Sequence, residues 1–287
     1  MSAVPQFFAD YQGRVHAEFH RLVPDEGGEV ERAMAYTVLA PSKQVRAVLV
    51  MLCAELCRGT AERAMPAAAA IELVHASSLI LDDLPSMDDA PLRRGRRACH
   101  LEFGESVAIL AAFGLLNLAY GELARAYEPP VASRMATLVS DAVGPAGLIG
   151  GQALDLRATD QQIDFETLER IHRGKTGALF VAAAACGAIT AAAAAEPIAA
   201  LSAYAKNLGL AFQIVDDLLD VAGDPLHTGK AVRADARKTT FVSFSGVDGA
   251  RQLAIELCET ANRALAPFGA KADRLRELSA FVAARRV

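Results

Sequence analysis

The first residues in this sequence with a clear capacity for chemistry are four carboxylates that follow an apolar segment. Asp82, Asp83, Asp88 and Asp89 fall within eight residues. Two carboxylates about 4 Å apart repel by roughly 4 kcal/mol at an effective dielectric near 20, so such a group needs solvent or a counter-ion. Asp82 and Asp88 are about 120° apart on an ideal helix, but a helix that ends at Pro85 lets the chain bring them together. A solvent-exposed acidic helix end is the alternative that needs no ligand.

A second acidic group lies inside an apolar run. Asp216 and Asp220 are four residues apart, which places them one turn apart on the same face of a helix, and Asp217 lies between them. Because residues 208–221 are mostly apolar, a fully solvated face is a weaker explanation here. Carboxylates without interleaved Cys or His favour Mg²⁺ over zinc and suit a substrate that carries phosphates. We expect Mg²⁺ as the cofactor, with Mn²⁺ able to replace it.

A cationic run, Leu92-Arg93-Arg94-Gly95-Arg96-Arg97, directly follows the first acidic group. Metal ions on one side of a diphosphate and guanidinium groups on the other would neutralise it from two directions. The alternative is that the arginines simply pair with the neighbouring aspartates. Other residues that could join such a site are Lys43 with Arg46, His75 seven residues before Asp82, Lys175 with Thr176, and Lys230 with Lys238. Taken singly, each is more often a surface charge or a structural histidine.

Helices are the elements expected to position these residues. The chain is 53% hydrophobic, rich in Ala and without Trp, a composition that fills a large core and favours helices over strands. Apolar residues recur at spacings of three and four, and Pro and Gly, including Pro66, mark the expected breaks. We expect an all-α fold of about ten helices in a single domain over residues 1–287, with irregular segments at 88–97 and 222–237.

Composition also excludes several classes of function. A net charge of −5 argues against a protein that coats nucleic acid or an anionic membrane. Five cysteines without a CxxC spacing argue against a secreted disulfide framework, and the first residues lack a signal-peptide pattern, so we expect a cytoplasmic protein. Residues 176–195 are uncharged over the length of a bilayer. They are mostly Ala, and we expect a buried helix there rather than a membrane span.

In their order along residues 43–244, these motifs resemble those of the trans-isoprenyl diphosphate synthases. Asp82-Asp83-x4-Asp88 with Arg93-Arg94-Gly95 looks like the family's first aspartate-rich motif, and Phe212-Gln213-x2-Asp216-Asp217-x2-Asp220 looks like the second. Three further segments are similar to bacterial geranylgeranyl diphosphate synthases: His75-x-Ser-Ser-Leu-Ile-Leu-Asp-Asp, Phe103-Gly-Glu-Ser-Val-Ala-Ile-Leu-Ala and Lys175-Thr-Gly-Ala-Leu-Phe. The resemblance implies a helical bundle of about ten or more helices around a central substrate cavity.

The resemblance also assigns roles to residues. It implies that Mg²⁺ is bound by Asp82 and Asp88 from one wall and by Asp216, Asp217 and Asp220 from the other, with Asp83 part of the catalytic set. The allylic diphosphate would be held by Arg93, Lys175, Thr176, Gln213 and Lys230, with Lys238 a weaker candidate. Isopentenyl diphosphate would be held by Lys43, Arg46, His75 and Arg94. The chain departs from the family pattern at Gln44, Arg97, Arg233 and Ala111-Ala-Phe113.

The implied reaction joins isopentenyl diphosphate to an allylic diphosphate, and we expect a C20 product from a homodimeric enzyme. Ser77 and Ser78, just before Asp82, are small, so no aromatic residue blocks a hydrocarbon tunnel there. Phe113, Leu116 and Tyr120 are candidates for its end. The alternatives are a C15 synthase, a non-catalytic partner subunit, a class I terpene cyclase and a helical metal-binding or acidic interaction protein. The last leaves the arginine run and Lys175-Thr176 unexplained, and a cyclase needs no second diphosphate site.

Overall fold

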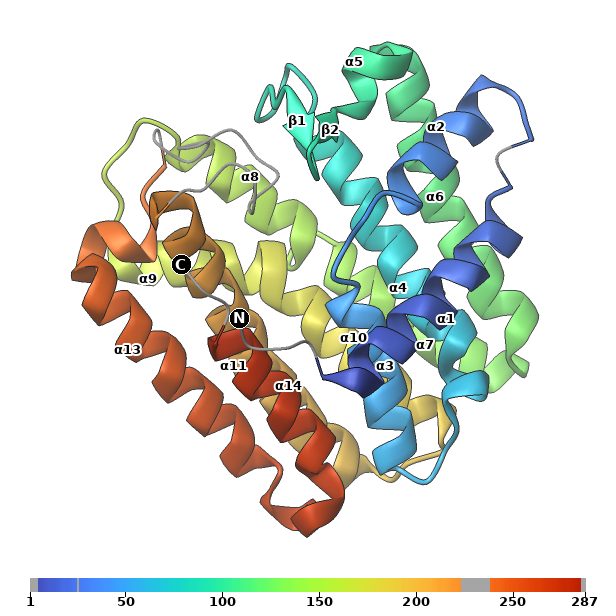
Figure 1. The fold of residues 1–287 in the computed structure, drawn as a ribbon, viewed down its shortest axis with the longest axis vertical. Helices are drawn as coiled ribbons and strands as arrows, with labels where there is room; N and C mark the ends of the chain where they lie inside the picture. The colour runs from blue at the N-terminus through green and yellow to red at the C-terminus, as the bar shows by residue number, and fades with distance from the viewer. Residues whose placement is uncertain (1–4, 25, 223–237, 285–287) are drawn as a thin grey trace.

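The structure is a computed structural model that describes residues 5–24, 26–222 and 238–284. It is a bundle of helices, which confirms the all-α prediction (Figure 1). The elements in chain order are α1 (Gln6–Leu22), α2 (Glu29–Val38), α3 (Val45–Leu56), α4 (Ala61–Asp82), β1 (Leu92–Arg93), β2 (Arg96–Arg97), α5 (Cys99–Phe103), α6 (Glu105–Ala126), α7 (Pro129–Val143), α8 (Leu148–Ala158), α9 (Phe165–His172), the π-helix η1 (Arg173–Gly177), α10 (Ala178–Thr190), α11 (Ala195–Ala222), α13 (Phe241–Ala264), the 3₁₀-helix η2 (Ala266–Ala272) and α14 (Asp273–Ala283).

The centre of the bundle is built from small residues. Helix α10, which falls within the uncharged stretch 176–195, packs against α3, α4, α7 and α11, and nearly all of its side chains are buried. The backbones come very close, because a Cβ atom on Gly187 would lie 2.2 Å from the carbonyl oxygen of Val50 in α3. The expectation of a buried helix is therefore confirmed. Among the described helices, α4, α6 and α11 are long and apolar enough to cross a membrane, by length and composition alone.

Helix α4 continues through Pro66, so the predicted break at this residue is wrong. Proline removes one backbone donor and its ring crowds the carbonyl four residues earlier, which normally interrupts a helix. Here the Tyr127 hydroxyl accepts a hydrogen bond from Ala67 N at 3.2 Å and donates one to Arg63 O at 2.7 Å. A buried side chain from the end of α6 therefore satisfies polar backbone groups on both sides of the proline.

The expected irregular segment after α4 contains a two-stranded hairpin. Leu92 pairs with Arg97 and Arg93 with Arg96, in antiparallel register. The two turn residues, Arg94 and Gly95, both have positive φ, of 55° and 74°. Positive φ at both central residues characterises a type I′ turn, whose twist matches that of paired strands. The hairpin thus fixes the directions of the arginine side chains that the sequence predicted to meet a substrate.

Candidate active site

The first acidic group is brought together by turns at the end of α4. The helix ends at Asp82, and Asp88 N donates a hydrogen bond back to Asp82 O at 2.9 Å. Two further turn bonds run from Met87 N and Asp89 N to Leu84 O. The chain therefore doubles back around Pro85 and brings Asp88 back to Asp82, as the sequence predicted. Both aspartates belong to one charged network.

Two lysines and a third carboxylate complete this network. Lys175 Nζ lies 2.8 Å from Asp155 Oδ2 and 3.7 Å from Asp82 Oδ2. Lys238 Nζ lies 2.8 Å from Asp88 Oδ1 and 2.9 Å from the same Asp155 oxygen. All five side chains are at most a quarter exposed. Lys238 thereby joins α8 to the loop before the β1–β2 hairpin, two segments that both lie at the top of Figure 1.

Mutual charge stabilisation sets the protonation of this network. Burial alone would raise the pKa of Asp155, but Lys175 and Lys238 outweigh it and hold the pKa below its ordinary value. Burial likewise would lower the pKa of Lys175, yet Asp82 and Asp155 raise it. Asp82 differs, because burial raises its pKa more than Lys175 lowers it. An additional cation near Asp82 would therefore favour its charged form.

Asp155 is a site residue that the sequence reasoning missed. It lies on the buried face of α8, one turn after Gly151, and that glycine packs directly on the backbone of η1. A Cβ atom on Gly151 would lie 2.2 Å from Lys175 N. The available signal was Gly150-Gly151-Gln152 followed by an Asp three residues later within an apolar helix. The π-helix that carries Lys175 is a rare conformation that often occurs at functional sites.

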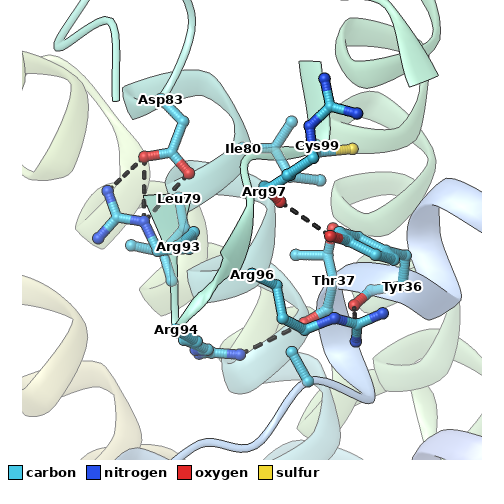
Figure 2. Close-up of a pocket in the computed structure, with 11 residues that line it drawn as sticks. Tyr36, Thr37, Leu79, Ile80, Asp83, Arg93, Arg94, Arg96, Arg97 and Cys99 are labelled. Carbon is cyan, nitrogen blue, oxygen red and sulfur yellow. Dashed lines mark hydrogen bonds and ion pairs between the residues drawn. The ribbon is translucent and has the colours of Figure 1, made fainter. Parts of the chain in front are cut away.

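Asp83 and Arg93 form a pair of their own, which supports the alternative interpretation for this arginine. Arg93 Nε donates to both Asp83 carboxylate oxygens at 3.0 Å, and Arg93 Nη2 also donates to Oδ1 (Figure 2). Asp83 is only 2% exposed. A carboxylate that is buried and occupied in this way orients the guanidinium group and is poorly placed to bind a metal ion. The two residues line a pocket of about 340 Å³, open mouth included, beneath the hairpin.

The second acidic group is tied to the elements on both sides of it. Thr176 Oγ1 donates to Gln213 Oε1 at 2.9 Å, and Gln213 Nε2 donates to Asp217 Oδ1 at 3.0 Å. The other Asp217 oxygen accepts from Phe241 N, the first residue of α13, at 3.1 Å. Asp217 is thus a buried anchor between α11 and α13, whereas Asp216 and Asp220 are half-buried. Lys230 and Arg233 lie outside the described residues.

The residues predicted to hold isopentenyl diphosphate also gather. Arg46, buried at the start of α3, stacks its guanidinium on the Phe180 ring with 4.6 Å from Cζ to the ring centroid. Burial, then Arg46 and Arg94, lower the pKa of His75 well below its ordinary value. In the described part of the chain, Arg46 Nε has no hydrogen-bond partner. Lys43 is exposed in the loop before α3, where its carbonyl oxygen accepts a hydrogen bond from Gln12 at 2.9 Å.

The residues predicted to control product chain length differ in burial and in their contacts. Ser77 is buried and its hydroxyl donates to Ala112 O on α6 at 2.8 Å, so this serine belongs to the contact between α4 and α6. Ser78 is half-buried and donates to His75 O within its own helix. Phe113 is 65% exposed on the outer face of α6, and the prediction that it could end an internal tunnel is wrong. Leu116 and Tyr120 are partly buried against the core.

The donor set fits magnesium bound together with a phosphate ligand. Among the described residues, no three His, Cys, Asp or Glu side chains form a group that could by itself hold a metal ion. Magnesium is usually bound by one or two carboxylates, several waters and the phosphates of a substrate, so it requires no such group. Asp82 and Asp88 supply two carboxylates, and Lys175 and Lys238 now neutralise them in part. The residues therefore suit a metal ion that arrives with a diphosphate.

An all-helical bundle with two acidic helix segments, and with partly buried lysines beside the first of them, suits a ligand that brings a diphosphate and metal ions together. The chain belongs to the polyprenyl synthetase family, whose sequence model matches residues 28–260. It is a short-chain prenyltransferase of the kind that makes farnesyl or geranylgeranyl diphosphate. The family interpretation of the sequence motifs is therefore confirmed.

Relatives of both product lengths are similarly close. The chain is 41% identical to farnesyl diphosphate synthase of Escherichia coli strain K12 over 256 residues, covering 87% of this chain and 86% of the relative. It is also 41% identical to the chloroplastic geranylgeranyl pyrophosphate synthase 11 of Arabidopsis thaliana over 266 residues, covering 89% and 74%.

Solved structures share the whole fold. An FPP/GFPP synthase from Zymomonas mobilis matches with a TM-score of 0.86 at 33% identity, covering 97% of this chain and 98% of that one. A geranyltransferase from Helicobacter pylori, solved with magnesium and isoprenyl diphosphate, matches with a TM-score of 0.85 at 26% identity, covering 98% and 97%.

Proposed function

We propose that this protein condenses isopentenyl diphosphate with allylic diphosphates and releases mainly geranylgeranyl diphosphate, the C20 product. The observation that carries the condensation is the network in which Asp155 joins Lys175 and Lys238 between Asp82 and Asp88. It places alternating charges of both signs in one partly buried site, which suits a diphosphate that enters with its metal ions. The C20 length rests on the small, half-buried side chain of Ser78, since Ser77 packs in the contact between α4 and α6.

In this proposal each wall has a distinct task. Asp82 and Asp88 on one side, with Asp216 and Asp220 on the other, would hold Mg²⁺, which supplies charge neutralisation for a departing diphosphate. Lys175 and Lys238 would turn from the carboxylates to the phosphate oxygens. Arg93, kept in place by Asp83, would face the same group. Lys43, Arg46, His75 and Arg94 would hold the second diphosphate.

The chemistry then needs little from side chains beyond charge and exclusion of water. As the allylic carbon–oxygen bond breaks, the positive charge on carbon is attacked by the double bond of isopentenyl diphosphate, and one proton is lost. The departing diphosphate is the acceptor in this proposal, so no side chain is named as general base. The Ala-rich helices around α10 would keep water from the cation.

We propose further that the enzyme is a cytoplasmic homodimer that pairs through α6. Ile109, Leu110 and Phe113 form an exposed apolar strip on that helix, and Leu101 of the adjoining α5 is also exposed. Large exposed apolar side chains grouped in this way are typical of a subunit interface. All five cysteines are free thiols, which suits the cytoplasm. A monomer of 30.3 kDa in light scattering would reject the dimer.

Product analysis tests the proposal. The purified chain is given isopentenyl diphosphate with C5, C10 or C15 allylic primers and Mg²⁺, and the products are separated by chain length. We expect a C20 product, loss of activity in chelator, and a fall of roughly a hundredfold or more in Asp82→Ala and Asp216→Ala. Asp141→Asn, an exposed carboxylate on α7, is the matched control and should retain full activity. A C15 main product would overturn the chain length alone, and no condensation at all would overturn the function.

A further inference from the structure

Helix α1 presents two histidines that the proposed reaction does not use. His16 and His20 are four residues apart and exposed, and their Nε2 atoms lie 3.2 Å apart. The two rings are nearly perpendicular, at 87°. The opposite face of the helix is buried in the core through Phe8, Tyr11, Val15 and Phe19. The pair is therefore held on a fixed scaffold, with its ring nitrogens open to solvent.

The separation of the two nitrogens matches that of a chelate. With metal–nitrogen bonds of about 2.0–2.1 Å, a 3.2 Å separation gives an angle of about 100–105° at the metal. This lies between the angle of about 90° in octahedral or square-planar sites and that of about 109° in a tetrahedron. A metal ion bound to both Nε2 atoms could therefore take the place of the hydrogen bond between the rings while the backbone of α1 stays in place.

The surroundings of the pair do not oppose a cation. Arg21, next to His20 in sequence, is turned to Glu18 at 2.7 Å and to Glu122 at 3.4 Å. Arg14 is likewise paired with Glu62 at 2.8 Å. Gly13, one turn before His16, has nothing within 4 Å of where a Cβ atom would lie. Both neighbouring arginines are thus neutralised, and both histidines are exposed, so water can complete a coordination sphere.

We propose that His16 and His20 form a two-histidine binding site for a transition-metal ion such as Zn²⁺, Ni²⁺ or Cu²⁺. Imidazole nitrogen suits these ions, with Cu²⁺ the tightest, whereas Mg²⁺ prefers oxygen ligands. The site is separate from the aspartate network, which takes hard cations. Once one imidazole binds, the second binds within the same complex, so the pair should bind far more tightly than either ring alone.

Calorimetric titration of the untagged full chain with Ni²⁺, in excess Mg²⁺ to occupy the carboxylates, tests the site. The proteins compared are the wild type, His20→Ala, and the double variant His20→Ala/Ala17→His. The double variant keeps the number of histidines but places the second ring at i+1, where it faces away from His16. We expect one Ni²⁺ per wild-type chain, bound at least about tenfold more tightly than by either variant.

Thermal unfolding gives a second measurement that requires no enzyme activity. A ligand that binds only the folded chain raises the melting temperature, so Ni²⁺ should raise that of the wild type and leave both variants nearly unchanged. Equal affinity in all three proteins would overturn the proposal, since the metal would then bind elsewhere. Wild-type affinity in the double variant would also overturn it, because the spacing of the rings would be irrelevant.

Discussion

Replacing Asp155 by Asn should destabilise the protein strongly, although the change is nearly isosteric. This carboxylate bonds two ammonium groups at once, at 2.8 and 2.9 Å, and the three side chains are 11–21% exposed. Hydrogen bonds to charged groups each contribute about 1.5–3 kcal/mol, and Asn keeps a neutral oxygen that can accept one of them. We therefore expect a loss of about 2–4 kcal/mol in the free energy of unfolding, or about 5–15 °C in melting temperature.

The dependence of this loss on pH follows from the lowered pKa of Asp155. The pKa of Asp155 is lower in the folded state than in the unfolded chain, where it is about 3.9. Such a group stabilises the fold at a pH above its unfolded pKa, and this stabilisation is lost as the pH falls through its folded-state pKa. The gap between wild type and Asp155→Asn should therefore be constant from about pH 8 to 5 and shrink below about pH 4.

Urea unfolding of metal-free protein, measured by circular dichroism, is the assay. Asp141→Asn on exposed α7 is the matched control and should change the free energy of unfolding by less than about 0.5 kcal/mol. If Asp155→Asn behaves like this control, or if its effect persists unchanged at low pH, Asp155 does not hold the two lysines and the account of the network is wrong.

Three further predictions concern other parts of the site and its scaffold. Tyr127→Phe should lower the free energy of unfolding in urea by about 1–3 kcal/mol, because Ala67 N and Arg63 O lose their partner. The loss should be smaller in a Pro66→Ala background, and an equal loss there would contradict the bridging role of Tyr127. The pKa of His75 is lowered in the folded state, so as the pH falls below about 6.5 this histidine is protonated in the unfolded chain before it is protonated in the folded one, which destabilises the fold. His75→Gln should therefore lose less free energy of unfolding than wild type between about pH 7 and 5.5, and an equal loss in both proteins would refute this. Ser78→Phe should shift products toward C15, whereas Ser77→Phe should mainly destabilise the α4–α6 contact, where Ser77 faces Ala112 O, by about 1–3 kcal/mol. An unchanged product ratio in a folded Ser78→Phe enzyme would contradict the tunnel hypothesis.

Sequence patterns predicted the parts of this site that depend on local spacing. The turn that joins Asp82 to Asp88 follows from a proline after a helical run, and the buried α10 follows from its Ala-rich composition. Pairings over long separations were beyond reach, because the glycines before Asp155 indicate close packing but do not say which side chains the aspartate meets. Its role depends on Lys175 and Lys238, which lie 20 and 83 residues away.

Pro66 also shows that local sequence rules fail where a residue from a distant part of the chain decides the structure. Local rules for proline predict a helix break, and the residue that prevents it, Tyr127, comes from a helix end about sixty residues later. Phe113 is another case. The sequence offered it as a candidate to end the hydrocarbon tunnel, but α6 turns it outward, and it is 65% exposed. The single-domain organisation and the cytoplasmic location stay predictions.

The close packing of Gly151 on η1 has a consequence for how variation among related sequences should be interpreted. The space between the Gly151 Cα and the amide of Lys175 holds no further atom, so every side chain, even a methyl group, is excluded on distance alone. A library of variants selected for activity should therefore return glycine at this position as strictly as it returns the aspartates proposed to bind Mg²⁺. Invariance at position 151 would then report how near two backbones lie, and it would be a mistake to assign that residue a part in the chemistry.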